Sequence, residues 1–304
     1  MTPEIVHVLA AVYTQKTEEW KSFLNGGGDD EGGALDALEQ SLLAMKILRR
    51  LLLVGYDFPN RDKEVGELWL LLQAHWDDIR QITMADKSPF ARPVVDILSK
   101  NLMQLSKLHL EMAEMHPAAF VHLPRSLDIV KTYWQIVRDF GNTYRDNAIH
   151  LPQNLLDTEL NPEEKSITEK LSIKGLLLSR ACLKMIFHPV QTFKYRHAQE
   201  KEEQSRAVSV LREELYTESA VIGWMKEILD HFFVFRKSDL HEWEEDPEEW
   251  ESKEEKESEG LEFSVRACAE RMFLDLVINF KNTLLEPLLD AFHRIIGANT
   301  SLLQ

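Results

Sequence analysis

The sequence is short of cysteine, glycine, proline and long apolar runs. Its 304 residues include 2 cysteines, 12 glycines and 11 prolines. Two cysteines are too few for a disulfide framework, so we expect Cys182 and Cys268 to be small buried side chains in a reducing compartment. Few turn residues in so long a chain predict helices joined by short links. Neither a secretory signal nor an uncharged apolar run of membrane-spanning length is present, and we expect a soluble protein with no membrane partner.

Positive charge is scarce as well. The chain has 35 Lys and Arg against 51 Asp and Glu, which gives a formal net charge of −16 at pH 7. This balance argues against direct nucleic-acid binding, because neutralising phosphates takes clustered Lys and Arg, and it favours basic partners. Most of the charge lies in one segment, since residues 239–262 hold 13 Asp or Glu and two Lys, a balance of −11.

Motifs of catalysis and metal binding are missing too. The Gly-rich segment 26–33 contains acidic residues and lacks the Lys-Ser/Thr that completes a phosphate-binding loop. The chain has neither the Gly-x-Ser-x-Gly of a nucleophile elbow nor the His-Glu-x-x-His of zinc proteases. Glu4-x-x-His7 and Asp290-x-x-His293 are similar to the paired motif of di-iron bundles, but they stand at opposite ends of the chain. We therefore predict no catalytic residue, no metal site and no cofactor, and thus a protein that is not an enzyme.

What the sequence does contain is helical periodicity. Apolar residues recur at three- and four-residue spacing along nearly the whole chain, whereas the alternation of half-buried strands is hard to find. The pattern predicts an all-α protein of about ten helices. They are expected at roughly 4–24, 35–54, 63–82, 91–115, 123–146, 166–187, 199–216, 218–235, 264–280 and 284–297.

One of these segments, 35–54, carries two apolar stripes. The first stripe comprises Leu38, Leu42 and Met45. The second comprises Leu43, Ile47, Leu51 and Val54. Because a helix with apolar residues on two sides must bury both, we expect this helix inside a stack and not on its surface.

Two segments share a template around a proline. Residues 90–98 and 284–292 each contain a proline, with an apolar residue three positions before it. After the proline come two apolar residues, an Asp and two more apolar residues. Because proline fits the first helical turn, Pro93 and Pro287 are predicted to mark helix starts. Together with a Val265-Arg-Ala-Cys-Ala helix, this recurrence is typical of HEAT repeats. We predict a HEAT-repeat α-solenoid with about six antiparallel helix pairs in a right-handed superhelical stack. An irregular helical bundle is the alternative.

Three links interrupt this array, which we expect to run continuously over residues 1–304. A Gly-rich acidic loop is predicted at 26–33, and a connector at 151–165. The connector ends in Asn161-Pro-Glu-Glu, which is typical of a helix start. An acidic loop is predicted at 239–262, within a repeat.

The acidic loop carries two tryptophans, which a merely solvated charged segment does not need. Trp243 and Pro247 are expected to dock the base of the loop on the helices, so that Trp243→Ala would cost about 1–3 kcal/mol of stability. The carboxylates are expected to form an anionic arm that attracts Lys- and Arg-rich partners by electrostatic steering. The expected partner-binding residues are Glu242, Trp243, Glu244, Glu245, Asp246, Glu248, Glu249, Trp250, Glu251, Glu254 and Glu255.

The same segment carries a family resemblance. A Trp-Glu-x-Asp-Pro element at 243–247 is followed by the acidic insertion and then by the Val-Arg-Ala-Cys-Ala helix at 265–269. Further matching elements are Val12-Tyr13-Thr14, Trp20, Ser41–Leu51, His116-Pro117-x-x-Phe120 and Leu285-Glu-Pro287-Leu-Leu. In their order and spacing these elements resemble the middle of nuclear transport receptors of the importin-β (karyopherin-β) superfamily, most of all the importin-eleven branch and its fungal counterpart.

The resemblance implies a central fragment of a nuclear import receptor that binds basic protein cargo non-covalently. It further implies passage through the nuclear pore by contacts with phenylalanine-glycine nucleoporins, and shuttling between cytoplasm and nucleus. Release of cargo would follow binding of Ran-GTP to the full-length protein, mainly through parts outside this fragment. Two alternatives stand beside it: a HEAT-repeat scaffold or adaptor unrelated to nuclear transport, and a helical enzyme with an unrecognised site.

Overall fold

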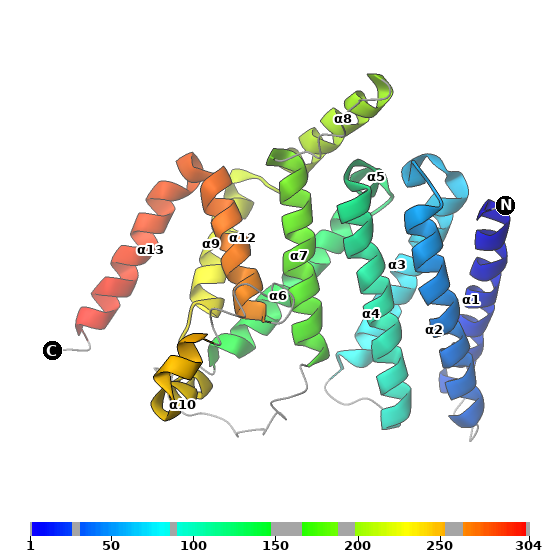
Figure 1. The fold of residues 1–304 in the computed structure, drawn as a ribbon, viewed down its shortest axis with the longest axis horizontal. Coiled ribbons are helices and arrows are strands. Elements are labelled where there is room, and N and C mark those ends of the chain that lie inside the picture. The colour runs from blue at the N-terminus through cyan, green and yellow to red at the C-terminus, as the bar shows by residue number, and fades with distance from the viewer. Residues whose placement is uncertain are drawn as a thin grey trace. The chain divides into compact units, whose positions relative to one another are not determined.

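The computed structural model describes residues 2–25, 31–85, 90–146, 166–187, 198–252 and 264–301. These ranges contain helices and no β-strand, which confirms the all-α prediction (Figure 1). None of the described helices is long and apolar enough to cross a membrane. In chain order the helices are α1 (Thr2–Asn25), α2 (Glu31–Val54), the 3-10 helix η1 (Pro59–Arg61), α3 (Lys63–Thr83), α4 (Arg92–Met115), α5 (Pro117–His122), α6 (Ser126–Asp146), α7 (Ile167–Phe187), α8 (Ala198–Glu214), α9 (Glu218–Phe232), α10 (Lys237–Glu245), α12 (Val265–Asn279) and α13 (Lys281–Ser301).

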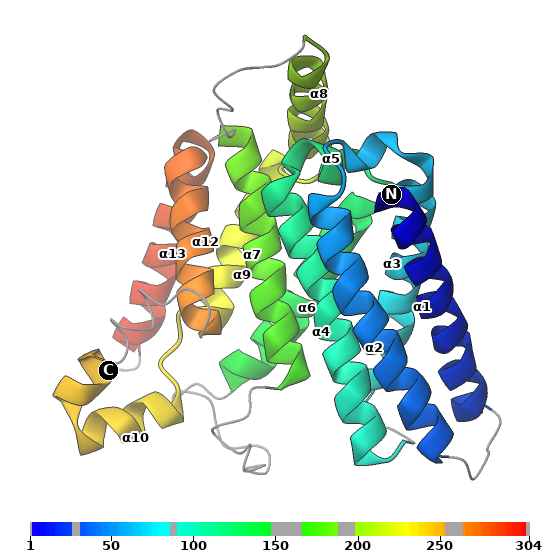
Figure 2. The same ribbon diagram turned by 45° about the vertical axis from the view of Figure 1, so that its right-hand side comes forward.

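The chain divides into two compact units, residues 1–129 and 130–304. In unit 1, α1 packs on α2, α3 packs on α4, and α2 also packs along α4 (Figures 1 and 2). In unit 2, α7 packs along α12, while α9 packs on both α12 and α13. Each unit is therefore built from helix pairs whose neighbours extend the same layers, as in HEAT repeats.

The predicted link at 26–33 differs from the structure in part, and the predicted connector at 151–165 falls outside the described residues. Helix α2 begins at Glu31, so the last three residues of the Gly-rich segment 26–33 are helical and the loop prediction is wrong for them. Residues 26–30 and the whole connector 151–165 lie outside the described residues. That the array is continuous and right-handed stays a prediction.

The core of unit 1 joins its helices through buried aromatic and polar side chains. The Tyr13 hydroxyl of α1 lies 3.2 Å from Nδ1 of His75 on α3. Trp76 donates its indole N–H to the Ser106 hydroxyl of α4 at 2.9 Å. His109 packs edge to face on Trp76, with ring centroids 5.6 Å apart. Because these polar groups are paired inside the core, they fix which faces of α1, α3 and α4 meet.

The α2 stripes are only half buried. Leu38 and Met45 of the first stripe are fully buried. The second stripe is largely open, with Leu43 60%, Ile47 42% and Val54 80% exposed. The prediction of burial on both sides is therefore wrong for this helix, because α1 and α4 together cover its first stripe and leave the second uncovered within the described residues.

In unit 2, α6 and α9 meet through stacked aromatic rings. The Trp134 and Trp224 rings stack with centroids 4.2 Å apart. Glu227 of α9 accepts hydrogen bonds at 2.6 Å from both the Trp134 indole N–H and the Arg138 guanidinium. A carboxylate that satisfies two donors of the facing helix fixes the register of this pair.

One of the two template prolines starts a helix and the other does not. Pro93 stands in the first turn of α4, as predicted. Pro287 lies inside α13, which begins six residues earlier at Lys281, so that prediction is wrong. The break between helices falls at Phe280, whose carbonyl accepts the backbone N–H of Leu284 at 2.9 Å. The apolar residues before Pro287 extend the helix backwards, and the ring removes only one hydrogen bond of the helix.

We expect Gly141→Ala to destabilise unit 2. A Cβ at Gly141 would lie 2.8 Å from Nδ1 and 3.0 Å from Cβ of His231 on α9, so α6 and α9 must separate or repack. The expected cost is about 1–3 kcal/mol in urea unfolding. Gly223→Ala is the matched control, because its Cβ meets no atom within 4 Å, and it should gain about 0.5–1 kcal/mol from helix propensity. Equal stabilisation by both substitutions would contradict the close helix contact.

We expect unit 1 to lose stability as pH falls from 6.5, because burial lowers the pKa of His109 to about 3. In the unfolded chain this histidine protonates near its usual pKa of about 6.5, whereas in the folded state it stays neutral until about pH 3. Stability present above pH 6.5 is thus lost on acidification, by about 2 kcal/mol at pH 5 from this residue.

The test measures the free energy of unfolding in urea at pH 7 and at pH 5 for the unchanged protein and two variants. His109→Gln should shrink the pH-dependent loss by about 2 kcal/mol, because glutamine does not titrate. His7→Gln, at an exposed position of α1, is the control substitution. A loss of the same size in all three proteins would refute the assignment to His109.

Candidate functional site

The acidic segment is helical where the structure describes it. Helix α10 covers 237–245, and residues 247–252 are helical again, so the prediction of a loop over 239–252 is wrong. Residues 253–262 lie outside the described part. The second helical stretch is capped by Asp246, whose Oδ1 accepts the backbone N–H groups of Glu248 and Glu249 at 3.1 and 3.0 Å. With Pro247 in the first position, Asp-Pro-Glu-Glu is the same kind of helix-start signal that the sequence shows at Asn161.

The base of this segment is held by a buried ion pair. Asp239, 3% exposed, accepts hydrogen bonds from the Arg236 guanidinium at 2.7 Å and the Arg236 backbone N–H at 2.9 Å. It also pairs with Arg266 of α12, whose guanidinium donates in addition to the Val234 carbonyl at 3.1 Å. Burial would raise the pKa of Asp239, but the hydrogen bonds from Arg236 and Arg266 outweigh it and hold this pKa below its usual value. One member of the acidic run is therefore a structural anchor.

Trp243 and Pro247 do not dock as predicted. Trp243 is 46% exposed and Pro247 is exposed, and Asp239 is the buried residue of α10. Trp250 is the one that packs, edge to face on Phe235 with ring centroids 5.6 Å apart. The segment is thus fastened by Asp239 and Trp250, and Trp243 stays open to solvent.

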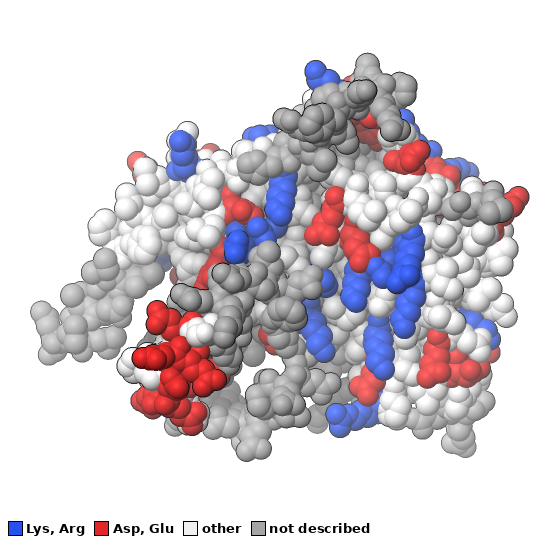
Figure 3. Space-filling model, in the orientation of Figure 1, with Lys and Arg blue, Asp and Glu red and all other residues white. Residues whose placement is uncertain are grey.

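The remaining predicted residues form one acidic surface, which we call the acidic arm. Between 239 and 252 there is no Lys or Arg. Figure 3 shows the carboxylates gathered where Figure 1 places α10. The structure brings together nine predicted site residues, from Glu242 to Glu251, while Glu254 and Glu255 lie outside the described residues. The exposed carboxylates are those of Glu244, Glu245, Asp246, Glu248, Glu249 and Glu251.

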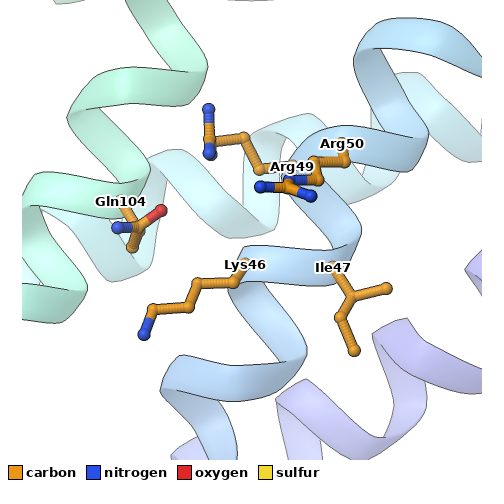
Figure 4. A pocket seen from close by; sticks show the side chains of 5 residues that line it. All are labelled: Lys46, Ile47, Arg49, Arg50 and Gln104. Atoms are coloured by element: carbon orange, nitrogen blue, oxygen red, sulfur yellow. The ribbon is translucent and has the colours of Figure 1, made fainter.

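Unit 1 contains a basic pocket that the sequence analysis missed. It is an open depression of about 470 Å³ between α2 and α4, and Figure 4 shows its lining side chains. They are Lys46, Ile47, Arg49 and Arg50 of α2 and Gln104 of α4. The i, i+3, i+4 spacing of the three cations does put them on one helix side. Nothing in the sequence shows that Gln104 faces them, because that depends on how α2 packs along α4.

The described residues contain no group of three or more His, Cys, Asp or Glu placed to hold a metal ion. Both cysteines are buried, and burial raises the pKa of the Cys182 thiol to about 12. What the two surfaces offer is non-covalent binding by charge.

We expect Asp239→Ala to cost about 3 kcal/mol of stability, because it leaves Arg266 buried without its carboxylate. Trp243→Ala should cost less than Asp239→Ala, and toward the lower end of the range of about 1–3 kcal/mol expected for a docked ring, since 46% of the Trp243 surface is exposed. Urea unfolding of both variants beside the unchanged protein measures the two costs. A larger loss for Trp243→Ala than for Asp239→Ala would show that the indole is the anchor.

Comparison with known proteins gives a consistent set of relatives, although no family model matches the chain. The importin beta-like protein KAP120 of Saccharomyces cerevisiae is 27% identical over 288 residues, which cover 94% of this chain and 25% of that protein. Human Importin-11 is 22% identical over 298 residues, covering 96% of this chain and 27% of that protein. The chain thus spans about a quarter of the length of these relatives.

The fold comparison agrees with the sequence comparison. The structure of Lph2, described as a novel bidirectional nuclear transport receptor in S. cerevisiae, matches 96% of this chain with a TM-score of 0.75 and 25% identity. That match covers 25% of the Lph2 chain. It confirms the predicted all-α HEAT-repeat fold class. In its helix-pair architecture and its sequence, the chain is similar to about a quarter of the length of nuclear transport receptors of the importin-β (karyopherin-β) family.

Proposed function

We propose that this chain is part of a nuclear transport receptor and that its acidic arm binds Lys- and Arg-rich segments of protein cargo. The family supports transport, and the acidic arm is the observation that carries the cargo class. Binding would be reversible and would leave the cargo chemically unchanged. The protein would accordingly move between cytoplasm and nucleus.

The geometry of the acidic arm suits a basic segment. Six exposed carboxylates lie within two short helical stretches, and residues 239–252 include no Lys or Arg. Such a field raises the rate of encounter with basic partners and gives affinity that salt weakens. The exposed Trp243 ring adds a face on which a Lys or Arg side chain can stack. Because Asp239 and Trp250 fix the base, the carboxylates are presented without unfolding the helices of unit 2.

We propose that release of cargo and passage through the nuclear pore occur as in receptors of the importin-β family. Ran-GTP would compete with cargo and shift the receptor toward a state that binds cargo less well. Contacts with phenylalanine-glycine nucleoporins would carry the receptor through the pore. Because Lph2 is described as bidirectional, we include export beside import as a second direction for this protein. The competing function is a HEAT-repeat scaffold that binds partners without regulation by Ran.

The test of the acidic arm uses charge neutralisation in the intact protein. The deletion of 239–262 would remove Asp239 and disturb Arg266, so substitutions are cleaner. The arm variant replaces Glu244, Glu248 and Glu249 by Gln, and the control variant replaces three exposed carboxylates of α8, Glu202, Glu213 and Glu214. A fluorescent Lys- and Arg-rich peptide should bind the arm variant about tenfold more weakly at low salt, and the control nearly as well as the unchanged protein.

The difference in peptide affinity between the arm variant and the control variant should shrink at moderate salt, because salt screens the attraction between the carboxylates and the peptide. Equal weakening of both variants would point to net charge alone and refute a role for the acidic arm. Addition of GTP-loaded Ran to the full-length receptor that contains this chain should displace a bound cargo. Absence of displacement would favour the scaffold over the transport receptor.

A further inference from the structure

The basic pocket of unit 1 has a charge opposite to that of the acidic arm, so capture of basic cargo does not account for it. We propose that this pocket binds an Asp- and Glu-rich segment of a partner polypeptide. The inference does not depend on the transport function, because it rests on the side chains of α2 and α4 alone.

Two cations of the pocket are available to a partner. Lys46 and Arg50 are exposed and form no ion pair with any residue that the structure describes. They are four residues apart on α2, so their charged groups lie on one side of the helix. Arg49 differs, because it is already paired with Glu111 of α4. A carboxylate-rich segment would thus meet two unneutralised cations within a chain whose net charge is −16.

Two polar atoms at the pocket wall lack partners within the described residues. Oε1 of Gln104 and Nε of Arg49 are both buried and make no hydrogen bond there. Buried polar atoms are usually hydrogen-bonded, and leaving them unpaired costs free energy. A polypeptide carries both kinds of group that would satisfy them: a backbone N–H for the Gln104 oxygen, and a carbonyl or carboxylate oxygen for the Arg49 N–H.

The apolar surface beside the pocket also favours a polypeptide over a nucleic acid. Ile47 lines the pocket at 42% exposure, and Leu43, one turn earlier on α2, is 60% exposed. Aliphatic residues of an acidic segment can cover both side chains. The five lining residues include no aromatic ring on which bases could stack, and the net negative charge opposes a long polyanion.

The test measures binding of a fluorescent twelve-residue peptide of alternating Glu and Leu to the intact protein. The pocket variant is Lys46→Glu with Arg50→Glu, and the matched control is Lys63→Glu with Arg92→Glu, two exposed cations of unit 1 outside the pocket. We expect the dissociation constant to rise at least about tenfold for the pocket variant and less than about twofold for the control. Because the four side chains are exposed, all variants should keep the unchanged melting temperature.

Further peptides and a third variant identify the occupant. A Gln and Leu peptide should bind the unchanged protein about tenfold more weakly than the Glu and Leu peptide, because it lacks the charge. Equal loss of peptide affinity in the pocket and control variants, or tighter binding of oligouridylate than of the acidic peptide, would overturn the proposal.

The acidic-arm variant tests another occupant. If it binds the Glu and Leu peptide more tightly than the unchanged protein does, the acidic arm of the same or another copy is the occupant, and the proposal is also overturned. A failure of this test leaves capture of basic peptides by the acidic arm unaffected, so the two proposals are judged separately.

Discussion

Burial of apolar side chains between adjoining helices is the constraint on which the rest of this structure depends. In unit 1, Leu38 and Leu48 of α2 are fully buried where that helix meets α1 and α4. In unit 2, Met272 and Leu276 of α12 are buried where it meets α7 and α9. A helix pair buries its apolar faces only by packing on the next pair, so the stability of each pair depends on its neighbours. One side of many helices therefore remains exposed to solvent. Charged residues on those open sides can change without disturbing the core.

The two charged surfaces use this freedom in different ways. The acidic arm is an insertion between α9 and α12, and it needs its own anchor, the buried pair of Asp239 with Arg266. The basic pocket needs none, because its cations lie on α2, which packs along α4. If both surfaces bind partners by charge as proposed, that binding would be fast, reversible and weakened by salt. Reversible binding of this kind is what a carrier requires.

Several sequence predictions were correct because they depended on local patterns. Helices α3, α4, α6, α7, α8 and α9 lie close to their predicted segments, since apolar periodicity and capping residues act within a few residues, whereas the short helix α5 was not predicted. The errors arose where local signals compete. Pro287 was read as a helix start although Leu284 and Leu285 continue the helix backwards, and a single proline is tolerated there. A large apolar ring such as Trp243 favours docking, yet 46% of its surface is exposed and the buried residue of α10 is Asp239. Nothing in the acidic run distinguishes Asp239, the buried carboxylate, from its exposed neighbours.

The sequence by itself determined the helical class, the repeat-like architecture, the family resemblance and the position of the acidic segment. These follow from periodicity, spacing and charge along the chain, which need no knowledge of the packing. Only the tertiary structure decided that Asp239 is buried against Arg266, that Trp250 packs while Trp243 does not, and that Gln104 faces the cations of α2. Each of these depends on which helix faces meet across tens of residues of sequence. Such contacts are set by the packing of the core as a whole, and no local pattern encodes them.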